Sequence, residues 1–143
     1  MVYRDPMSLN QPDIVTLWVL RTDAPETVAA LFTTPYTEDG DATPSAFMEA
    51  YRLPGYDEDF AELHLGGTAE ALIQAAASTW RTLDEQALSR LPTGAWNGLY
   101  LLSGQAGDEW TAPERRPPMP HGEVQIGEVV FRLVDSCHVL VRP

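Results

Sequence analysis

Apolar positions along the chain form short groups of strand-like character, separated by prolines and glycines. The longest group runs from Ile14 to Leu20 and is rich in β-branched and aromatic residues. Near-continuous apolarity of this kind is typical of a strand that is covered on both faces, so we predict a central strand here. Further strands are predicted from Phe60 to Leu65 and from Trp96 to Ser103.

Helical spacing of apolar residues appears between these strands. Thr22 or Asp23 is suited to cap a helix that carries Val28, Leu31 and Phe32 on one face and packs on the sheet. The other predicted helices are bounded by capping residues or by proline and glycine, and they span residues 45–53, 68–77 and 79–91.

The C-terminal part of the chain completes the predicted fold. Val129 to Val134 and Val139 to Val141 flank Asp135-Ser136, a pattern that predicts an antiparallel hairpin. A length of 143 residues suits one hydrophobic core. We therefore predict an α+β fold, a single domain in which a mixed or antiparallel β-sheet packs with several α-helices. The domain is expected to span residues 14–143, after a loose N-terminal leader (1–13) and with a proline-rich surface loop (104–120).

Charge narrows the function classes. The chain has 21 acids against nine bases, a net charge of −12, and every base is an arginine. Without lysine, a Walker-type phosphate loop, a Schiff-base enzyme and a Ser–Lys hydrolase are excluded. Scattered arginines disfavour binding to nucleic acid, whose phosphates are contacted mainly by clustered Lys and Arg. The charge instead favours cationic partners, although acidity also simply maintains solubility.

The N-terminal region and the cysteine content bear on the compartment. The stretch from Ile14 to Leu20 is too short to span a membrane, and no basic region of an export signal precedes it. Cys137 is the single cysteine, so no internal disulfide can form. We expect a soluble, cytoplasmic protein that does not bind membranes.

Acidic residues concentrate in one stretch of the sequence, where eight acids fall within 25 residues that contain one base, Arg52. A calcium site is one interpretation, but no register satisfies the ligand spacing of an EF-hand loop. A pair of catalytic carboxylates, Asp57 and Asp59, is a second. The third is a recognition surface with aromatic anchors. From the residues alone, a solvated face with no binding role explains the acids equally well. The acids are Glu38, Asp39, Asp41, Glu49, Asp57, Glu58, Asp59 and Glu62.

Other chemistry has weaker support. His64, His121 and His138 are far apart and lack the spacing of a metal site. Adjacent strand residues point to opposite faces, so Cys137 and His138 favour an inert buried cysteine over an activated thiolate. GxSxG, HExxH and GxGxxG motifs do not occur. We expect no cofactor and no metal.

Four features in order resemble the immunity protein 22 family of bacterial polymorphic toxin systems. They are a strand ending in Leu17-Trp18-Val19, the acidic loop at 36–41, Pro44 to Met48 with its Ser-x-Phe pattern, and Tyr56-Asp57-Glu58-Asp59-Phe60-Ala61-Glu62. The resemblance covers residues 14–60 and continues more faintly to the Trp96-Asn97 strand. It implies a small cytoplasmic protein that binds and neutralises a toxin domain encoded beside it, with no catalytic residues carried over.

Charge and resemblance together lead to one expectation. We expect a toxin-neutralising immunity protein, not an enzyme, whose acidic surface binds a cognate toxin domain such as a basic nuclease. The alternative is a small enzyme or ligand-binding domain that uses Asp57 and Asp59 in a pocket. The expected partner-binding residues are Tyr36, Glu38, Asp39, Asp41, Tyr56, Asp57, Glu58 and Asp59.

Overall fold

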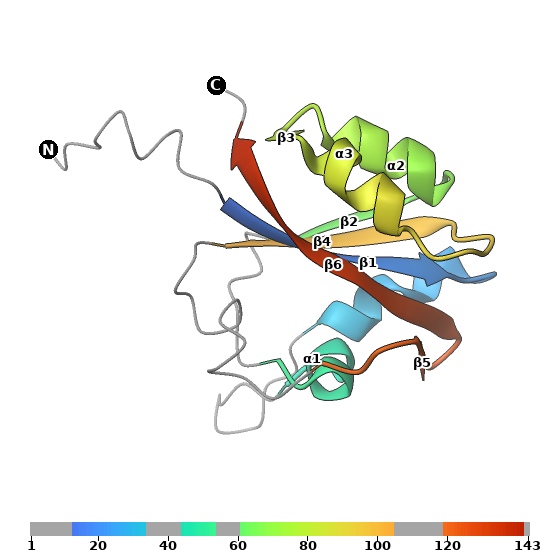
Figure 1. Ribbon diagram of the computed structural model, residues 1–143. Helices are drawn as coiled ribbons and strands as arrows, with labels where there is room; N and C mark the ends of the chain where they lie inside the picture. The colour runs from blue at the N-terminus through green and yellow to red at the C-terminus, as the bar shows by residue number, and fades with distance from the viewer. Residues whose placement is uncertain (1–12, 34–43, 54–60, 105–118, 142–143) are drawn as a thin grey trace, which may run out of the picture.

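The computed structural model describes residues 13–33, 44–53, 61–104 and 119–141 (Figure 1). Within them, six strands form an antiparallel sheet in the order β2-β4-β1-β6-β3, and β5 also pairs with β6. The predicted α+β class is confirmed, and the sheet is antiparallel. The strands are β1 (Asp13–Arg21), β2 (Ala61–Leu65), β3 (Trp80–Arg81), β4 (Gly98–Gly104), β5 (Glu123–Ile126) and β6 (Val129–Val141).

Strand β1 lies at the centre of the sheet, between β4 and β6, as its apolar sequence predicted. Every residue from Ile14 to Leu20 is buried. Since side chains alternate along a strand, Val15, Leu17 and Val19 point to one face, and Trp18 and Leu20 point to the other. Both faces of the sheet therefore need a covering layer.

Helices supply that layer on each side. Figure 1 shows α2 (Ala69–Ala76) and α3 (Leu83–Ala87) over one face, and α1 (Ala46–Tyr51) over the opposite face. We call the first the alanine face, because Ala69, Ala76, Ala77 and Ala87 line it beside Ile73 and Leu83. We call the second the aromatic face, which is built from Trp18, Phe32, Phe47, Tyr51, Tyr100 and Phe131.

The two predicted helix starts at Ser45 and Thr68 are confirmed. The Ser45 hydroxyl accepts a hydrogen bond from the backbone N–H of Met48 at 3.2 Å, and Thr68 accepts one from Ala71 at 3.2 Å. Each side chain thereby satisfies an N–H that has no partner within the helix. Helix α1 ends at Arg52, whose φ of 57° lies in the left-handed region.

The helix predicted after Thr22 is instead two 3₁₀ turns, η2 (Pro25–Thr27) and η3 (Ala29–Phe32). The Thr22 hydroxyl accepts a hydrogen bond from the N–H of Ala24 rather than capping a helix. The β-branched Thr27-Val28 pair disfavours a longer helix in so short a segment. Val28, Leu31 and Phe32 still pack on the aromatic face, as their spacing predicted.

The helix predicted over 79–91 was also too long. Trp80 belongs to β3, Thr82 has a left-handed φ of 70°, and the remainder divides into α3 and η5 (Leu88–Arg90). Strand pairing of β3 with the end of β6 takes precedence over the helical pattern here. The predicted apolar stripe does face the core, because Leu83 and Ala87 are buried on the alanine face.

The predicted C-terminal hairpin around Asp135-Ser136 was wrong. These residues lie inside the single long strand β6, and the hairpin is formed by β5 and β6 instead. Asp135 and Ser136 pair in register with Leu17 and Thr16, and a register shift next to them leaves Val134 as the extra residue of β6. The Ser136 hydroxyl lies 2.8 Å from that of Thr16, and Asp135 pairs with Arg90 at 2.6 Å. Satisfied polar groups therefore let the strand continue.

Candidate functional site

The sequence-predicted partner-binding residues fall in two segments, 34–43 and 54–60. All eight of them, from Tyr36 to Asp59, lie outside the residues that the structure describes. The carboxylate-pocket alternative, which uses Asp57 and Asp59, lies outside them as well. A cleft at the end of β1, formed by described residues, was not among the sequence predictions.

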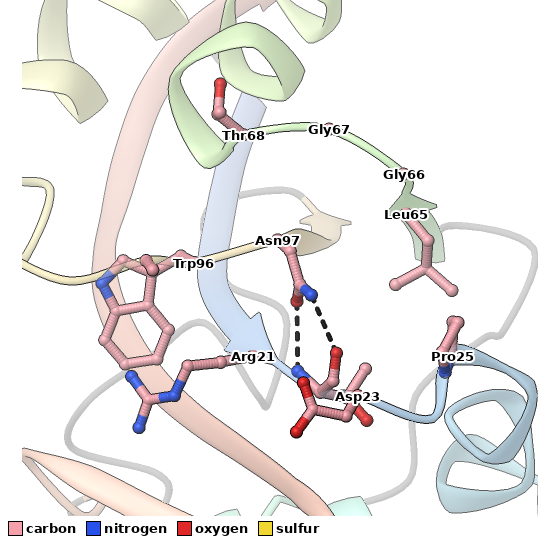
Figure 2. Close-up of a pocket in the computed structure, with 11 residues that line it drawn as sticks. Arg21, Asp23, Pro25, Leu65, Gly66, Gly67, Thr68, Trp96 and Asn97 are labelled. Carbon is pink, nitrogen blue, oxygen red and sulfur yellow. Dashed lines mark hydrogen bonds between the residues drawn. The ribbon is translucent and has the colours of Figure 1, made fainter.

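A cleft of about 690 Å³ opens where three strand ends meet. Its walls come from the end of β1 and η2, from the turn between β2 and α2, and from the segment that enters β4 (Figure 2). Two glycines in the turn present backbone without side chains to the opening. The lining residues are Arg21, Thr22, Asp23, Pro25, Leu65, Gly66, Gly67, Thr68, Ala95, Trp96 and Asn97.

Asn97 fixes the base of the cleft. Its side-chain oxygen accepts a hydrogen bond from the N–H of Thr22 at 3.1 Å, and its side-chain nitrogen donates to the carbonyl of Thr22 at 2.8 Å, as Figure 2 shows. The side-chain amide thus pairs with the backbone as a peptide group would. The N–H of Asn97 also donates to the carbonyl of Leu20. Together these bonds hold the C-terminal end of β1 against the N-terminal end of β4.

Trp96 and Arg21 form one wall of the cleft. The Trp96 indole is 4% exposed, and its Nε1 donates to the carbonyl of Pro92 at 3.0 Å. The guanidinium of Arg21 lies 4.9 Å from the centre of the indole and also pairs with Glu123 at 2.9 Å. Stacking and pairing together hold the Arg21 side chain and place a carboxylate next to its charge.

Close packing at Gly98 joins β2 to β4 beside the cleft. A Cβ at this position would lie 2.5 Å from Leu20 Cδ1 and 2.9 Å from Leu65 Cδ2. Only glycine lets these two leucine side chains approach the backbone of β4. Leu65 therefore holds a fixed place on the apolar side of the cleft.

Four acids lie in or next to the segments that line the cleft. Asp23 lines it, Glu26 follows Pro25 in η2, and Glu70 lies in the first turn of α2 after Thr68. Glu128 lies next to the end of β1, because its backbone carbonyl accepts a hydrogen bond from the Thr22 hydroxyl at 3.5 Å. All four side chains are exposed, and we call them the acidic rim: Asp23 lines the cleft, and the other three neighbour lining residues along the chain or through a backbone contact.

A second polar cluster lies on the edge strand β2. Glu62 and His64 share a face of the strand, and the indole Nε1 of Trp80 donates to Glu62 Oε2 at 3.2 Å. His64 Nε2 is 3.8 Å from Glu62 Oε1, too far for a hydrogen bond. Their two-residue spacing on a strand could have predicted this proximity. The carboxylate connects β2 to β3.

Metal-ligand clusters and the cysteine thiol are two features that bear on possible chemistry. In the part of the chain that the structure covers, no group of three or more His, Cys, Asp or Glu is arranged to hold a metal ion. Cys137 is fully buried, and burial, reinforced by Asp135, raises the pKa of its thiol to about 11. The thiol therefore stays protonated at neutral pH, as expected of an inert core cysteine.

Sequence reasoning missed the cleft because none of its residues belongs to a recognisable motif. Gly66-Gly67 directly precedes the helix predicted over 68–77, and Asn97 lies in the strand predicted from Trp96 to Ser103. An asparagine where a strand enters the sheet is a signal for side-chain pairing with the backbone, but its partner Thr22 is 75 residues away. Only the strand pairing brings the two together.

Comparison with known proteins gives one match. Residues 15–112 match the model of a protein family described as immunity protein 22. This range spans more than half of the chain and includes all the cleft-lining residues. Neither a curated protein nor a solved structure matches. None of the described helices is long and apolar enough to cross a membrane.

Proposed function

The chain belongs to the immunity protein 22 family, and on that premise we propose that it binds a cognate toxin domain directly and blocks it as a non-enzymatic inhibitor. The family match over residues 15–112 is the observation that carries this proposal. Immunity against a toxin is the general role that the family description gives. Direct binding in the bacterial cytoplasm, to the product of a neighbouring gene in a polymorphic toxin system, is the finer step that we add.

The charge of the chain supports a basic partner. A net charge of −12 produces a negative field that attracts a basic surface and speeds association. A toxin that cuts nucleic acid has such a surface, because its substrate is a polyanion. We propose that two acidic stretches, 36–41 and 56–59, cover it with six acids and two tyrosines: Tyr36, Glu38, Asp39, Asp41, Tyr56, Asp57, Glu58 and Asp59.

A growth-rescue assay tests the inhibitor function. The protein encoded immediately upstream is expressed in a test bacterium, with and without this chain, and the pair is then purified together. We expect rescue of growth and a stable complex. A toxic neighbour that is neither rescued nor bound would contradict the proposal.

Paired charge reversals test the acidic surface separately. Asp57→Arg with Asp59→Arg changes the charge by four units and is expected to slow association at least tenfold at low salt. The matched control is Asp84→Arg with Glu85→Arg on α3, which makes the same charge change elsewhere. Equal association rates for the two double variants would place the interface away from the acidic stretch.

A further inference from the structure

We propose that the cleft at the end of β1 receives an arginine or lysine side chain from a loop of the toxin. This inference rests on the proposed function and adds a defined contact to it. It adds a docking site where β1 and β2 end and β4 begins. This site is separate from the proposed acidic stretches, which lie outside the described residues.

The charges at the cleft specify a cationic occupant. Among the described lining residues, Arg21 and Asp23 are charged, and Arg21 is already paired with Glu123 at 2.9 Å and stacked on Trp96. Asp23 is exposed and makes no ion pair with any residue that the structure describes. A carboxylate without an ion-pair partner, beside an arginine that already pairs with another carboxylate, attracts a cation.

The remaining walls fit the apolar stem of a long basic side chain. Pro25 and Leu65 lie together on one side of the cleft, and Figure 2 shows the side chains of Trp96 and Arg21 on the opposite side. Arginine and lysine bury their methylene groups against apolar surface while the charged end reaches a polar partner. A volume of about 690 Å³ leaves space for such a side chain and part of its loop.

The extent of the acidic rim points to a protein rather than to a small cation. Glu26, Glu70 and Glu128 come from η2, α2 and the turn between β5 and β6. Exposed acids on three separate elements match a basic protein surface around an inserted side chain better than they match one small cation.

The base of the cleft is preorganised for this role. The paired hydrogen bonds between Asn97 and Thr22 fix the backbone next to Asp23, and the close packing at Gly98 fixes Leu65. A site that is held in place before binding loses less conformational entropy when the partner docks.

Two variants alter the cleft by independent means. Asp23→Arg removes the proposed counter-charge, and Ala95→Trp fills the opening at an exposed position without altering a charge. The matched controls are Glu85→Arg on α3 and Ala75→Trp on the exposed side of α2. All variants are first compared by thermal unfolding, so that a loss of binding is separated from a loss of fold.

Affinity is then measured against an inactivated form of the toxin encoded beside this chain. We expect Asp23→Arg and Ala95→Trp each to weaken binding at least tenfold, with both controls within threefold of wild type. A photo-crosslinking residue in place of Glu70 on the rim is expected to capture a toxin segment that contains arginine or lysine.

The outcomes separate the two proposals. If wild type binds the toxin and both cleft variants bind equally well, the cleft inference is overturned and the inhibitor function stands. Capture of an acidic or wholly apolar toxin segment from the rim would also overturn it. If wild type itself does not bind, the proposed function fails, and the cleft inference fails with it.

Discussion

The alanine face and the aromatic face cover the same sheet with different side chains. On the alanine face, small side chains of α2 and α3 lie against Val15, Leu17 and Val19 of β1. On the aromatic face, α1 and two 3₁₀ turns surround rings whose centres lie 3.9 to 6.0 Å apart. Alanine leaves little side-chain volume between a helix and a sheet, whereas large rings fill the space on the aromatic face. Smaller side chains should therefore destabilise the aromatic face most, and larger side chains should destabilise the alanine face most.

Loss of a ring on the aromatic face should have the largest effect. Phe47 is fully buried and lies within ring-contact distance of Trp18, Phe32, Tyr51 and Phe131. Phe47→Ala should lower the free energy of unfolding by about 4 kcal/mol, because the short segments around it cannot close the cavity. Chemical denaturation measures the change, and Phe47→Leu should lose much less. A loss below about 2 kcal/mol would show that this face collapses easily.

Enlargement on the alanine face should have the next largest effect. Ala87 is fully buried in α3, which packs on both α2 and β6. Ala87→Leu should lower the free energy of unfolding by about 2 kcal/mol, since the added carbons displace a closely packed helix. Ala75→Leu makes the same change at an exposed position of α2 and should be nearly neutral. A neutral Ala87→Leu would remove the proposed difference between the faces.

The smallest effect concerns a polar group that the aromatic face buries. The Tyr51 hydroxyl is buried with no hydrogen-bond partner among the described residues, and burial raises the pKa of Tyr51 well above its usual range. Tyr51→Phe removes a hydroxyl that costs free energy to desolvate. We expect an unchanged free energy of unfolding or a gain of up to about 1 kcal/mol. A loss of similar size would identify a hydrogen bond to the hydroxyl in the folded protein.

Sequence patterns identified most of the elements but not all of their types. Strand β1 and helices α1 and α2 were predicted close to their observed bounds, because their apolar periods and their caps at Ser45 and Thr68 are local signals. The errors occur where a distant strand decides the outcome. Trp80 joins β6 instead of a helix, and Asp135-Ser136 continues a strand instead of turning.

The sequence alone determined the acidic charge, the absence of lysine chemistry, the two-sided burial of β1 and the family resemblance, which the match over residues 15–112 confirms. These properties depend on composition or on residues near one another in the chain. Tertiary structure alone decided the cleft. Its walls come from segments around 21–25, 65–68 and 95–97, and its base depends on Asn97 meeting Thr22 across the β1–β4 pair. Because strand register sets such meetings, no local pattern of residues could have predicted them.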